Sequence, residues 1–351
     1  MFSILVLTLS ASVPHPAVAQ KDIERKLPTW LQTSGVASAA VAYIHEGQVA
    51  WTTVRGEASP EIRATNETLY NVASLTKPLV AETIVRLAAM GRLDLDEPMH
   101  RYWTDPDIAS DPRHLQLTPR FALSHRTGFP NWRQQTKTGK LSFKGEPGQS
   151  VGYSGEGYEY VARFAEKKLQ IGFEQLLQDR VLKPLGLART AITPQAWFDD
   201  AIRAHGYDKQ GRARPADVNA QFSAADNAYT QIADYAAFTA AVLRNEGLTP
   251  SIARQRLKTE RPAFEPGRCP WAKEDCPKKV GFALGWAVFD FGSERVVLQG
   301  GADWGERALA FFVPKRKIGV VILTNSARGG AVIHRVVETL YDNVAFHRFL
   351  A

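Results

Sequence analysis

Two runs of apolar and β-branched residues lie close together near the start of the chain, at 36–44 and 49–54. Glu46 and Gly47 stand between them, and a short polar segment with glycine between two such runs is typical of a tight turn. The pattern therefore predicts a β-hairpin in this part of the chain.

A second block of strand-like segments lies near the C-terminus, at 282–291, 295–298, 308–314 and 318–324. A turn is expected at Gly292-Ser293, after the first of these segments. In the last part of the chain, 331–346, apolar residues recur at helical spacing. We therefore expect several strands followed by a helix at this end.

The long segment between these blocks has a mainly helical pattern. Helices are expected at 78–90, 158–169 and 232–243, and a glycine follows each within a few residues, as at many helix ends. Strands at both ends with helices between them indicate an α/β fold of the α+β kind, in which an antiparallel sheet flanked by helices carries an inserted helical lobe. We place the α/β lobe at about 20–74 and 256–351 and the helical lobe at about 75–255. A small-molecule site is expected in the cleft between them.

Residues 1–19 have the features of a secretory signal peptide. They contain an apolar run from Ile4 to Val13, followed by the small residues Ala17-Val18-Ala19 that a signal peptidase accepts. We expect cleavage near Ala19, a mature domain of residues 20–351, and a periplasmic or secreted location. Met1-Phe2-Ser3 lacks the usual Lys or Arg, so an earlier start or another export route stays open. No later apolar run is long enough to span a membrane.

The composition is that of a globular protein, with 44% hydrophobic and 23% charged residues. The net charge of +7 is scattered without basic tracts, so nucleic acid is not an expected partner. Cys269 and Cys276 lie close together, and in an oxidising compartment such a pair forms a local disulfide. The alternative is two unreactive thiols, and with no nearby histidine they cannot complete a zinc site.

Ser74-Leu-Thr-Lys77 is the only Ser-x-x-Lys in the chain, and it lies at the start of the predicted helix 78–90. Residues three apart on a helix share one face, so the Lys77 amine can take the proton of the Ser74 hydroxyl. A serine at a helix start also has a free backbone N–H, which can hold an oxyanion. The alternative is a capping serine beside a solvated lysine, because such a motif occurs by chance about once in a chain of this size.

Further motifs follow in a fixed order around Ser74. They are Leu69-Tyr-Asn71-Val-Ala, Met90-Gly-Arg-Leu-Asp-Leu-Asp96, Leu117-Thr-Pro-Arg-Phe-Ala-Leu-Ser-His125-Arg-Thr-Gly-Phe-Pro-Asn131, Pro147-Gly148, Tyr153-Ser-Gly-Glu-Gly-Tyr158, Pro184-Leu-Gly-Leu187, Gln299-Gly-Gly-Ala-Asp-Trp-Gly305 and Thr324-Asn325. From about residue 35 to about 326 the chain thus resembles the serine β-lactamase and penicillin-binding protein-like family. That family includes class C β-lactamases, D,D-peptidases and family VIII esterases.

The resemblance implies roles for residues outside the Ser-x-x-Lys motif. Tyr153 matches the family's catalytic tyrosine, which passes a proton between nucleophile, lysine and leaving group. A phenol is a poor base without a neighbouring cation, which Lys77 would supply. Ala302 matches the residue whose backbone N–H, with that of Ser74, forms the oxyanion hole. The alternative for Tyr153 is an aromatic at a loop edge.

Gly300 and Gly301 are expected to let a substrate approach the strand backbone closely, although glycines there can also mark a β-bulge. Gln299 and Gly155 depart from the family pattern. Gln299 stands where many β-lactamases and D,D-peptidases have a cation that faces the substrate carboxylate. Gly155 stands where those enzymes have an asparagine that binds the substrate amide. All four positions are expected in substrate binding, and the two departures count against efficient penicillin hydrolysis.

The sequence thus predicts a secreted, monomeric serine hydrolase that needs no metal or other cofactor. It would act through a Ser74 acyl-enzyme on a small ester, a D-amino-acid peptide or a β-lactam. The alternative is a penicillin-recognising protein that binds a cell-wall peptide with little turnover. No Gly-x-Ser-x-Gly or His-Glu-x-x-His motif supports another hydrolase class, and His125 is expected to be a packing residue.

Overall fold

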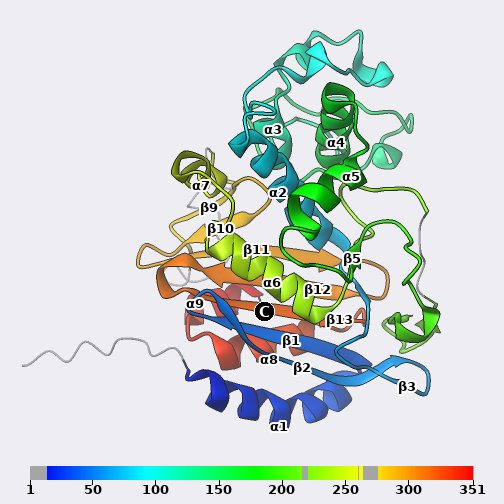
Figure 1. Cartoon of the computed structure of the whole chain (residues 1–351), viewed down its shortest axis with the longest axis vertical. Helices are drawn as coiled ribbons and strands as arrows, with labels where there is room; N and C mark the ends of the chain where they lie inside the picture. The colour runs from blue at the N-terminus through cyan, green and yellow to red at the C-terminus, as the bar shows by residue number, and fades with distance from the viewer. Residues whose placement is uncertain (1–13, 216–219, 260, 264–275, 351) are drawn as a thin grey trace, which may run out of the picture.

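The computed structural model describes residues 14–215, 220–259, 261–263 and 276–350. At its centre lies an eight-stranded sheet with the strand order β3-β2-β1-β13-β12-β11-β10-β9. Every pair of neighbouring strands in it is antiparallel. The strands are β1 (Ser38–His45), β2 (Gln48–Ser59), β3 (Ile62–Arg63), β9 (Lys279–Phe282), β10 (Ala287–Asp290), β11 (Arg295–Ala302), β12 (Arg307–Val313) and β13 (Ile318–Thr324). The expected antiparallel sheet is confirmed, and it places the N-terminal β1 beside the C-terminal β13 (Figure 1).

The hairpin predicted near the start of the chain is formed by β1 and β2. Its turn residues Glu46 and Gly47 have φ values of 50° and 73°. Two successive positive φ angles belong to the tight turn whose twist matches that of paired strands, and glycine adopts one at no steric cost. The prediction is confirmed.

The predicted segment 282–291 is not one strand but parts of two, because β9 ends at Phe282 and β10 begins at Ala287. The turn between them contains Gly285, with a φ of 89°. A Cβ on Gly285 would lie 2.4 Å from the Cβ of Ala81, so glycine lets this turn approach a neighbouring helix. The other turn residues are apolar, so the sequence pattern does not show the break between β9 and β10.

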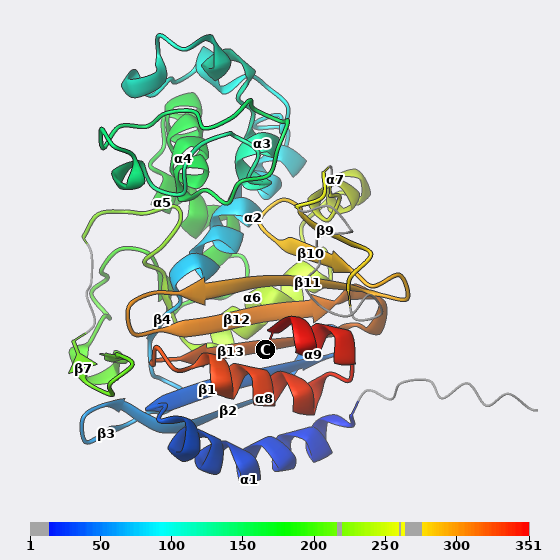
Figure 2. The same ribbon diagram turned by 180° about the vertical axis from the view of Figure 1, so that it is seen from behind.

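Helices cover both faces of the sheet. On one face pack α1 (Pro16–Ser34), α8 (Gly330–Leu340) and α9 (Val344–Leu350), and on the other lies α6 (Ile232–Leu243) (Figures 1 and 2). The predicted helix 331–346 is thus two helices. Tyr341 separates them, and its hydroxyl donates to Glu294 at 2.8 Å. Each face of the sheet has its own apolar core.

The inserted segment between β4 (Tyr70–Asn71) and β9 contains most of the remaining helices. These are α2 (Thr76–Ala89), α3 (Pro119–Leu123), α4 (Gly155–Leu169), α5 (Phe173–Leu177) and α7 (Pro250–Arg256). The predicted helices thus exist as α2, α4 and α6, but α4 begins three residues earlier than expected, at Gly155, and ends at Leu169, before Gln170 with its left-handed backbone. Because α6 packs on the sheet, not all of this segment lies in a separate helical lobe. The expected lobe boundaries stay predictions.

Short strands and turns complete the described parts of the chain. The strands are β4 (Tyr70–Asn71), β5 (Thr190–Ala191), β6 (Gly206–Tyr207), β7 (Ala213–Arg214) and β8 (Tyr229–Thr230). The short turns are η1 (Ala73–Leu75), η2 (Met99–Arg101), η3 (Pro106–Ile108), η4 (Pro112–Gln116), η5 (Arg133–Gln135), η6 (Gln178–Leu182), η7 (Asp200–Ile202) and η10 (Pro314–Arg316). None of the helices described has the length and apolarity needed to cross a bilayer.

The expected signal cleavage point lies in the first turn of α1. Ala19 is 3% exposed and packs in the same apolar core as Ile23. Residues 1–13 lie outside the described part of the chain, so the signal peptide stays a prediction. Cys269 also lies outside it, and the same holds for the expected disulfide with Cys276.

Candidate active site

Ser74 lies in a constrained turn between β4 and α2. Ala73, directly before it, has a φ of 47°, an unfavourable angle for a residue with a side chain. The side chain of Asn71 accepts from the Ala73 N–H at 2.8 Å, and the Thr76 hydroxyl donates to the Ala73 carbonyl at 2.7 Å. These bonds fix the strained residue, and backbone strain of this kind is concentrated at functional sites.

Lys77 lies beside Ser74 on the first turn of α2, as the three-residue spacing predicts. Its Nζ donates to Ser74 Oγ at 2.9 Å and to the Ala225 carbonyl at 2.8 Å. Lys77 is 1% exposed, so its amine is fixed by these contacts rather than by water. The serine hydroxyl and the lysine amine are therefore in position for proton transfer.

Tyr153 is brought to the same place from the loop before α4. Its ring centre lies 5.0 Å from Lys77 Nζ, and its hydroxyl accepts from Gln299 Nε2 at 3.1 Å. Tyr153 is 36% exposed, so its ring also faces solvent. A cavity of about 360 Å³ is lined by Ser74, Lys77, Asn131, Trp132, Tyr153, Asp226, Gly300, Gly301 and Ala302. The three expected catalytic residues thus share one cavity.

His125 supports Tyr153 from behind. Its Nδ1 accepts from the Ser154 N–H at 3.1 Å, and its ring centre lies 4.3 Å from that of Tyr153 and 4.7 Å from that of Phe282. Burial lowers the pKa of His125 to about 3, and the Lys77 cation adds to this. A histidine that stays neutral near pH 7 and is surrounded by rings is a packing and hydrogen-bonding residue, as expected.

The two glycines of β11 have different surroundings. A Cβ on Gly301 would lie 2.2 Å from the Val72 carbonyl oxygen, whereas the nearest atom to a Cβ on Gly300 is 3.9 Å away. Gly301 therefore allows β11 to pack against the turn that contains Ser74, and the space at Gly300 belongs to the cavity. Ala302 lines the cavity with Ser74. Its part in an oxyanion hole stays a prediction.

Gln299 lies behind the cavity rather than in its lining. The residue is 5% exposed, and its Nε2 donates to the Tyr153 hydroxyl at 3.1 Å and to the Gly300 carbonyl at 3.0 Å. A side-chain amide has two N–H donors. Both donors of Gln299 are therefore used within the protein.

The space beside Gly155 is filled by Trp132. A Cβ on Gly155 would lie 2.7 to 2.9 Å from three atoms of the Trp132 ring, closer than real Cβ atoms come. The indole thus takes the volume that any side chain at position 155 would need, including that of the asparagine expected from the family pattern. Asn131 lies next to it, and its Oδ1 accepts from the Gly155 N–H at 2.9 Å. The sequence did not identify either Asn131 or Trp132 as a site residue.

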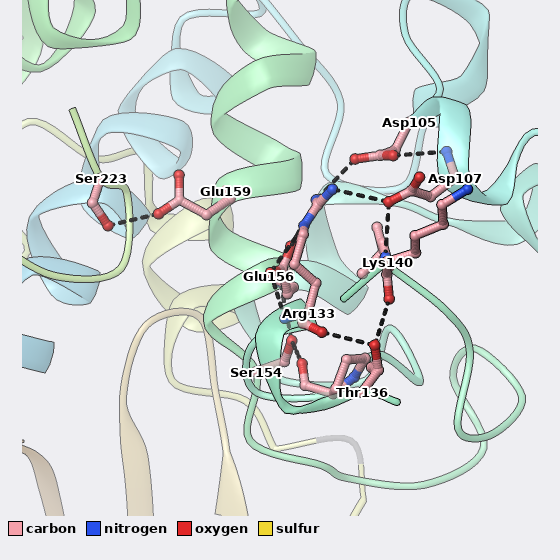
Figure 3. Close-up of polar contacts among 12 residues, drawn as sticks. Asp105, Asp107, Arg133, Thr136, Lys140, Ser154, Glu156, Glu159 and Ser223 are labelled. Atoms are coloured by element: carbon pink, nitrogen blue, oxygen red, sulfur yellow. Dashed lines mark hydrogen bonds and ion pairs between the residues drawn. The ribbon is translucent and has the colours of Figure 1, made fainter. Parts of the chain in front are cut away.

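A partly buried ion cluster holds the loop that carries Trp132. Figure 3 shows the Arg133 guanidinium between the carboxylates of Asp105, Asp107 and Glu156. The shortest of these contacts, to Glu156 on α4, is 2.8 Å. The Glu156 hydrogen bond is the main cause of the raised pKa of Arg133. The cluster ties residues 131–133 to α4 and so fixes one wall of the cavity.

A second polar contact in Figure 3 supports the loop that carries Ala225, whose carbonyl is the other hydrogen-bond partner of Lys77. The Ser223 hydroxyl donates to Glu159 on α4 at 2.6 Å. Burial raises the pKa of Glu159, and the bond from Ser223 opposes this rise. Ser223 stands two residues before Ala225, whose carbonyl accepts from Lys77. Helix α4 thus positions this loop as well.

One carboxylate lines the cavity, and others lie close enough to interact with it. Asp226 lines the cavity, and burial raises its pKa, with a further contribution from Asp303. Burial also raises the pKa of Glu306 to about 7. Asp226 was not identified from the sequence, because it belongs to a loop far from Ser74 along the chain. No group of three or more His, Cys, Asp or Glu side chains in the described ranges is arranged to hold a metal ion.

Comparisons with known proteins show what this chain is similar to. The chain is 22% identical to Protein flp of Staphylococcus aureus (strain MW2) over 352 residues, which covers 94% of this chain and 67% of that protein. It is 25% identical to D-alanyl-D-alanine-carboxypeptidase/endopeptidase AmpH of Escherichia coli (strain K12) over 203 residues, 52% of each protein.

Two solved structures share the fold. The octameric penicillin-binding protein homologue from Pyrococcus abyssi matches with a TM-score of 0.76 and 20% identity, over 92% of this chain and 78% of that one. The D-alanine carboxypeptidase AmpC from Burkholderia cenocepacia matches with a TM-score of 0.74 and 18% identity, over 93% and 100%. At these identities the likeness concerns the fold alone.

A family model also matches most of the chain. The model described as Beta-lactamase matches residues 21–338, which is nearly the whole chain. The resemblance of the sequence motifs to this family of serine hydrolases is thereby confirmed. The chain belongs to the beta-lactamase family.

Proposed function

We propose that this protein is an exported serine hydrolase in which Ser74 attacks an ester or amide carbonyl and forms an acyl-enzyme. The observation that supports this most directly is the 2.9 Å contact between Lys77 Nζ and Ser74 Oγ in a cavity that Tyr153 also lines. A serine becomes an effective nucleophile only when a base within hydrogen-bond reach removes its proton. Lys77 is the group in reach of Ser74.

The reaction begins when the Lys77 amine takes the Ser74 proton and Oγ bonds to the carbonyl carbon. The resulting oxyanion accepts from the N–H groups of Ser74 and Ala302. The carbon then expels the leaving group, which receives a proton through the Tyr153 hydroxyl. A water molecule attacks the acyl-Ser74 ester in the same way, and the acid leaves with Ser74 restored.

The substrate is an ester or a small amide rather than an efficiently hydrolysed penicillin. Gln299 has no N–H left for a substrate carboxylate, and Trp132 replaces the amide-binding asparagine at Gly155. The relative AmpH is named as a D-alanyl-D-alanine carboxypeptidase and endopeptidase, which favours peptides of D-amino acids among the amides.

The test compares hydrolysis of p-nitrophenyl butyrate and of nitrocefin by the wild type, Ser74→Ala and Lys77→Ala. Ser251→Ala, at an exposed serine of α7, is the matched control. We expect ester hydrolysis by the wild type and the control, and a fall of about a thousandfold or more in both site variants. Equal hydrolysis by Ser74→Ala would refute the proposal. Acylation by a penicillin without release would instead be the behaviour of a binding protein.

Export and oligomeric state are separate proposals. Export predicts a mature N-terminus at Gln20 in the periplasm or medium, which N-terminal mass spectrometry of the secreted protein reads directly. We also propose a monomer, although the structural relative from Pyrococcus abyssi is octameric. Sedimentation velocity tests this, and a larger species at micromolar concentration would contradict it.

A further inference from the structure

Asp226 is the one carboxylate among the described residues that line the catalytic cavity. It directly follows Ala225, whose carbonyl accepts from Lys77 Nζ at 2.8 Å. Within the described part of the chain, the Asp226 side chain has one hydrogen bond, from the Asn227 N–H at 2.9 Å, and no ion pair. A half-buried carboxylate with so few partners carries a charge that a bound cation can neutralise.

The same cavity offers no side-chain cation for a substrate carboxylate. Gln299 is neutral and its two N–H donors are used by Tyr153 and by Gly300. Lys77 lines the cavity and its charge acts on Asp226, but its amine donates to Ser74 and Ala225. The charged side chain that the cavity leaves without a strong hydrogen-bond donor is therefore the Asp226 carboxylate.

Other charged groups at this end of the cavity add to the negative potential. Asp303 and Glu306 follow β11 and lie close enough to Asp226 for their charges to interact. Arg214 lies over the Trp304 ring at 5.4 Å, next to Asp303. Arg307 is a second nearby cation, and its Nη1 donates to the carbonyls of Asp303 and Glu306 at 2.6 Å. Its guanidinium is thus bound to the loop itself, and it reduces the negative charge without facing a ligand as a donor.

The position of Asp226 relative to Tyr153 indicates which half of the substrate it faces. Tyr153 protonates the leaving group, and Gln299 at the middle of β11 holds its hydroxyl. Asp226 instead lines the cavity with Ala302, the last residue of β11, and its charge interacts with Asp303, directly after Ala302, as well as with Lys77. A strand rises about 3.3 Å per residue, so Gln299 and Ala302 are about 10 Å apart. Asp226 therefore lies toward the acyl half.

We propose that the site prefers esters or amides whose acyl group carries an ammonium, such as amino acids or peptides with a free N-terminus. This inference rests on the proposed acyl-enzyme function and specifies its substrate. The ammonium is attracted by the Asp226 carboxylate, whereas an acyl group with a carboxylate is repelled by it.

Three p-nitrophenyl esters with one leaving group test the inference. The 4-(trimethylammonio)butanoate is cationic, the 5,5-dimethylhexanoate is its neutral isostere, and the monoadipate is anionic. For the wild type we expect kcat/KM to be at least about tenfold higher for the cationic ester than for the neutral one, and lowest for the anionic one. Asp226→Asn should reduce this cation preference to within about threefold of unity. Asp179→Asn, which removes an exposed carboxylate of η6, is the control that should keep the preference.

Three outcomes would overturn the inference, and a fourth would refute the proposed function instead. A wild type without cation preference overturns the inference, and so does a preference that survives in Asp226→Asn. A loss of activity in Asp226→Asn that is equal on all three esters also overturns it, because Asp226 would then act on Lys77 rather than on the substrate. If the wild type hydrolyses none of the esters by a Ser74-dependent route, the proposed function fails instead.

Discussion

Gly155→Ala is the substitution whose effect depends most directly on the structure of the site. Gly155 is the first residue of α4, so its backbone is helical and alanine adopts it without strain. The obstacle is the Trp132 ring, because three of its atoms would lie 2.7 to 2.9 Å from the new Cβ. The ring must move for the alanine to fit, although Arg133 holds its loop to α4.

Two opposing terms set the size of the effect. Overpacking of this kind costs about 1–3 kcal/mol. Replacing a helical glycine by alanine returns up to about 1 kcal/mol, because the unfolded chain loses freedom. We therefore expect Gly155→Ala to lower the free energy of unfolding by about 1–2 kcal/mol. In a Trp132→Ala background, where the nearest atoms are gone, the same change should raise it by about 0.5 kcal/mol.

Urea unfolding of the four proteins in this double-mutant cycle measures the coupling between the two residues. A coupling of about 2 kcal/mol is expected, within the range for residues in contact. Gly157→Ala is the matched control in the same helix turn, since the nearest atom to its Cβ is 3.4 Å away. If Gly155→Ala has the same effect with and without Trp132, then Trp132 does not fill this space and the explanation of Gly155 is wrong.

Three further predictions concern the walls of the cavity. Gly301→Ala should lower the free energy of unfolding by about 1–3 kcal/mol and abolish ester hydrolysis, whereas Gly300→Ala should be tolerated. Similar unfolding curves for the two variants would contradict this. Gln299→Ala removes the bond to Tyr153, worth about 1 kcal/mol, so kcat should fall about fivefold with little change in KM. A change confined to KM would mean that Gln299 binds substrate. The pKa of Glu306 is raised to about 7 by burial, so the wild type should lose stability as pH rises through this value. Between pH 5 and pH 8, the free energy of unfolding of the wild type should fall by about 2 kcal/mol more than that of Glu306→Gln. A difference between the two proteins that does not change with pH would refute this.

The features that could be predicted from the sequence are those determined by residues close together along the chain. The β1–β2 hairpin depends on two strand-forming runs and a turn with Gly47, all within one segment. Ser74 and Lys77 meet because they are three residues apart on one helix face. Local spacing and turn chemistry suffice for both.

The parts that it did not predict depend on volumes and contacts between distant segments. Gly155 departs from the family pattern because Trp132 occupies its space, and no periodicity along the chain shows a filled volume. Asp226 reaches the cavity from a loop that Lys77 contacts across 148 positions of sequence. Gln299 aligned with a substrate-binding position, yet its donors are used by its own neighbours. Each of these requires the folded arrangement.

Intact-mass spectrometry after treatment with a fluorophosphonate shows whether Ser74 is the nucleophile. We expect one phosphonyl adduct on the wild type and on Ser251→Ala, mapped to the peptide that contains Ser74, and no adduct on Ser74→Ala. An adduct of equal yield on Ser74→Ala, or an unlabelled wild type that is correctly folded, would contradict this.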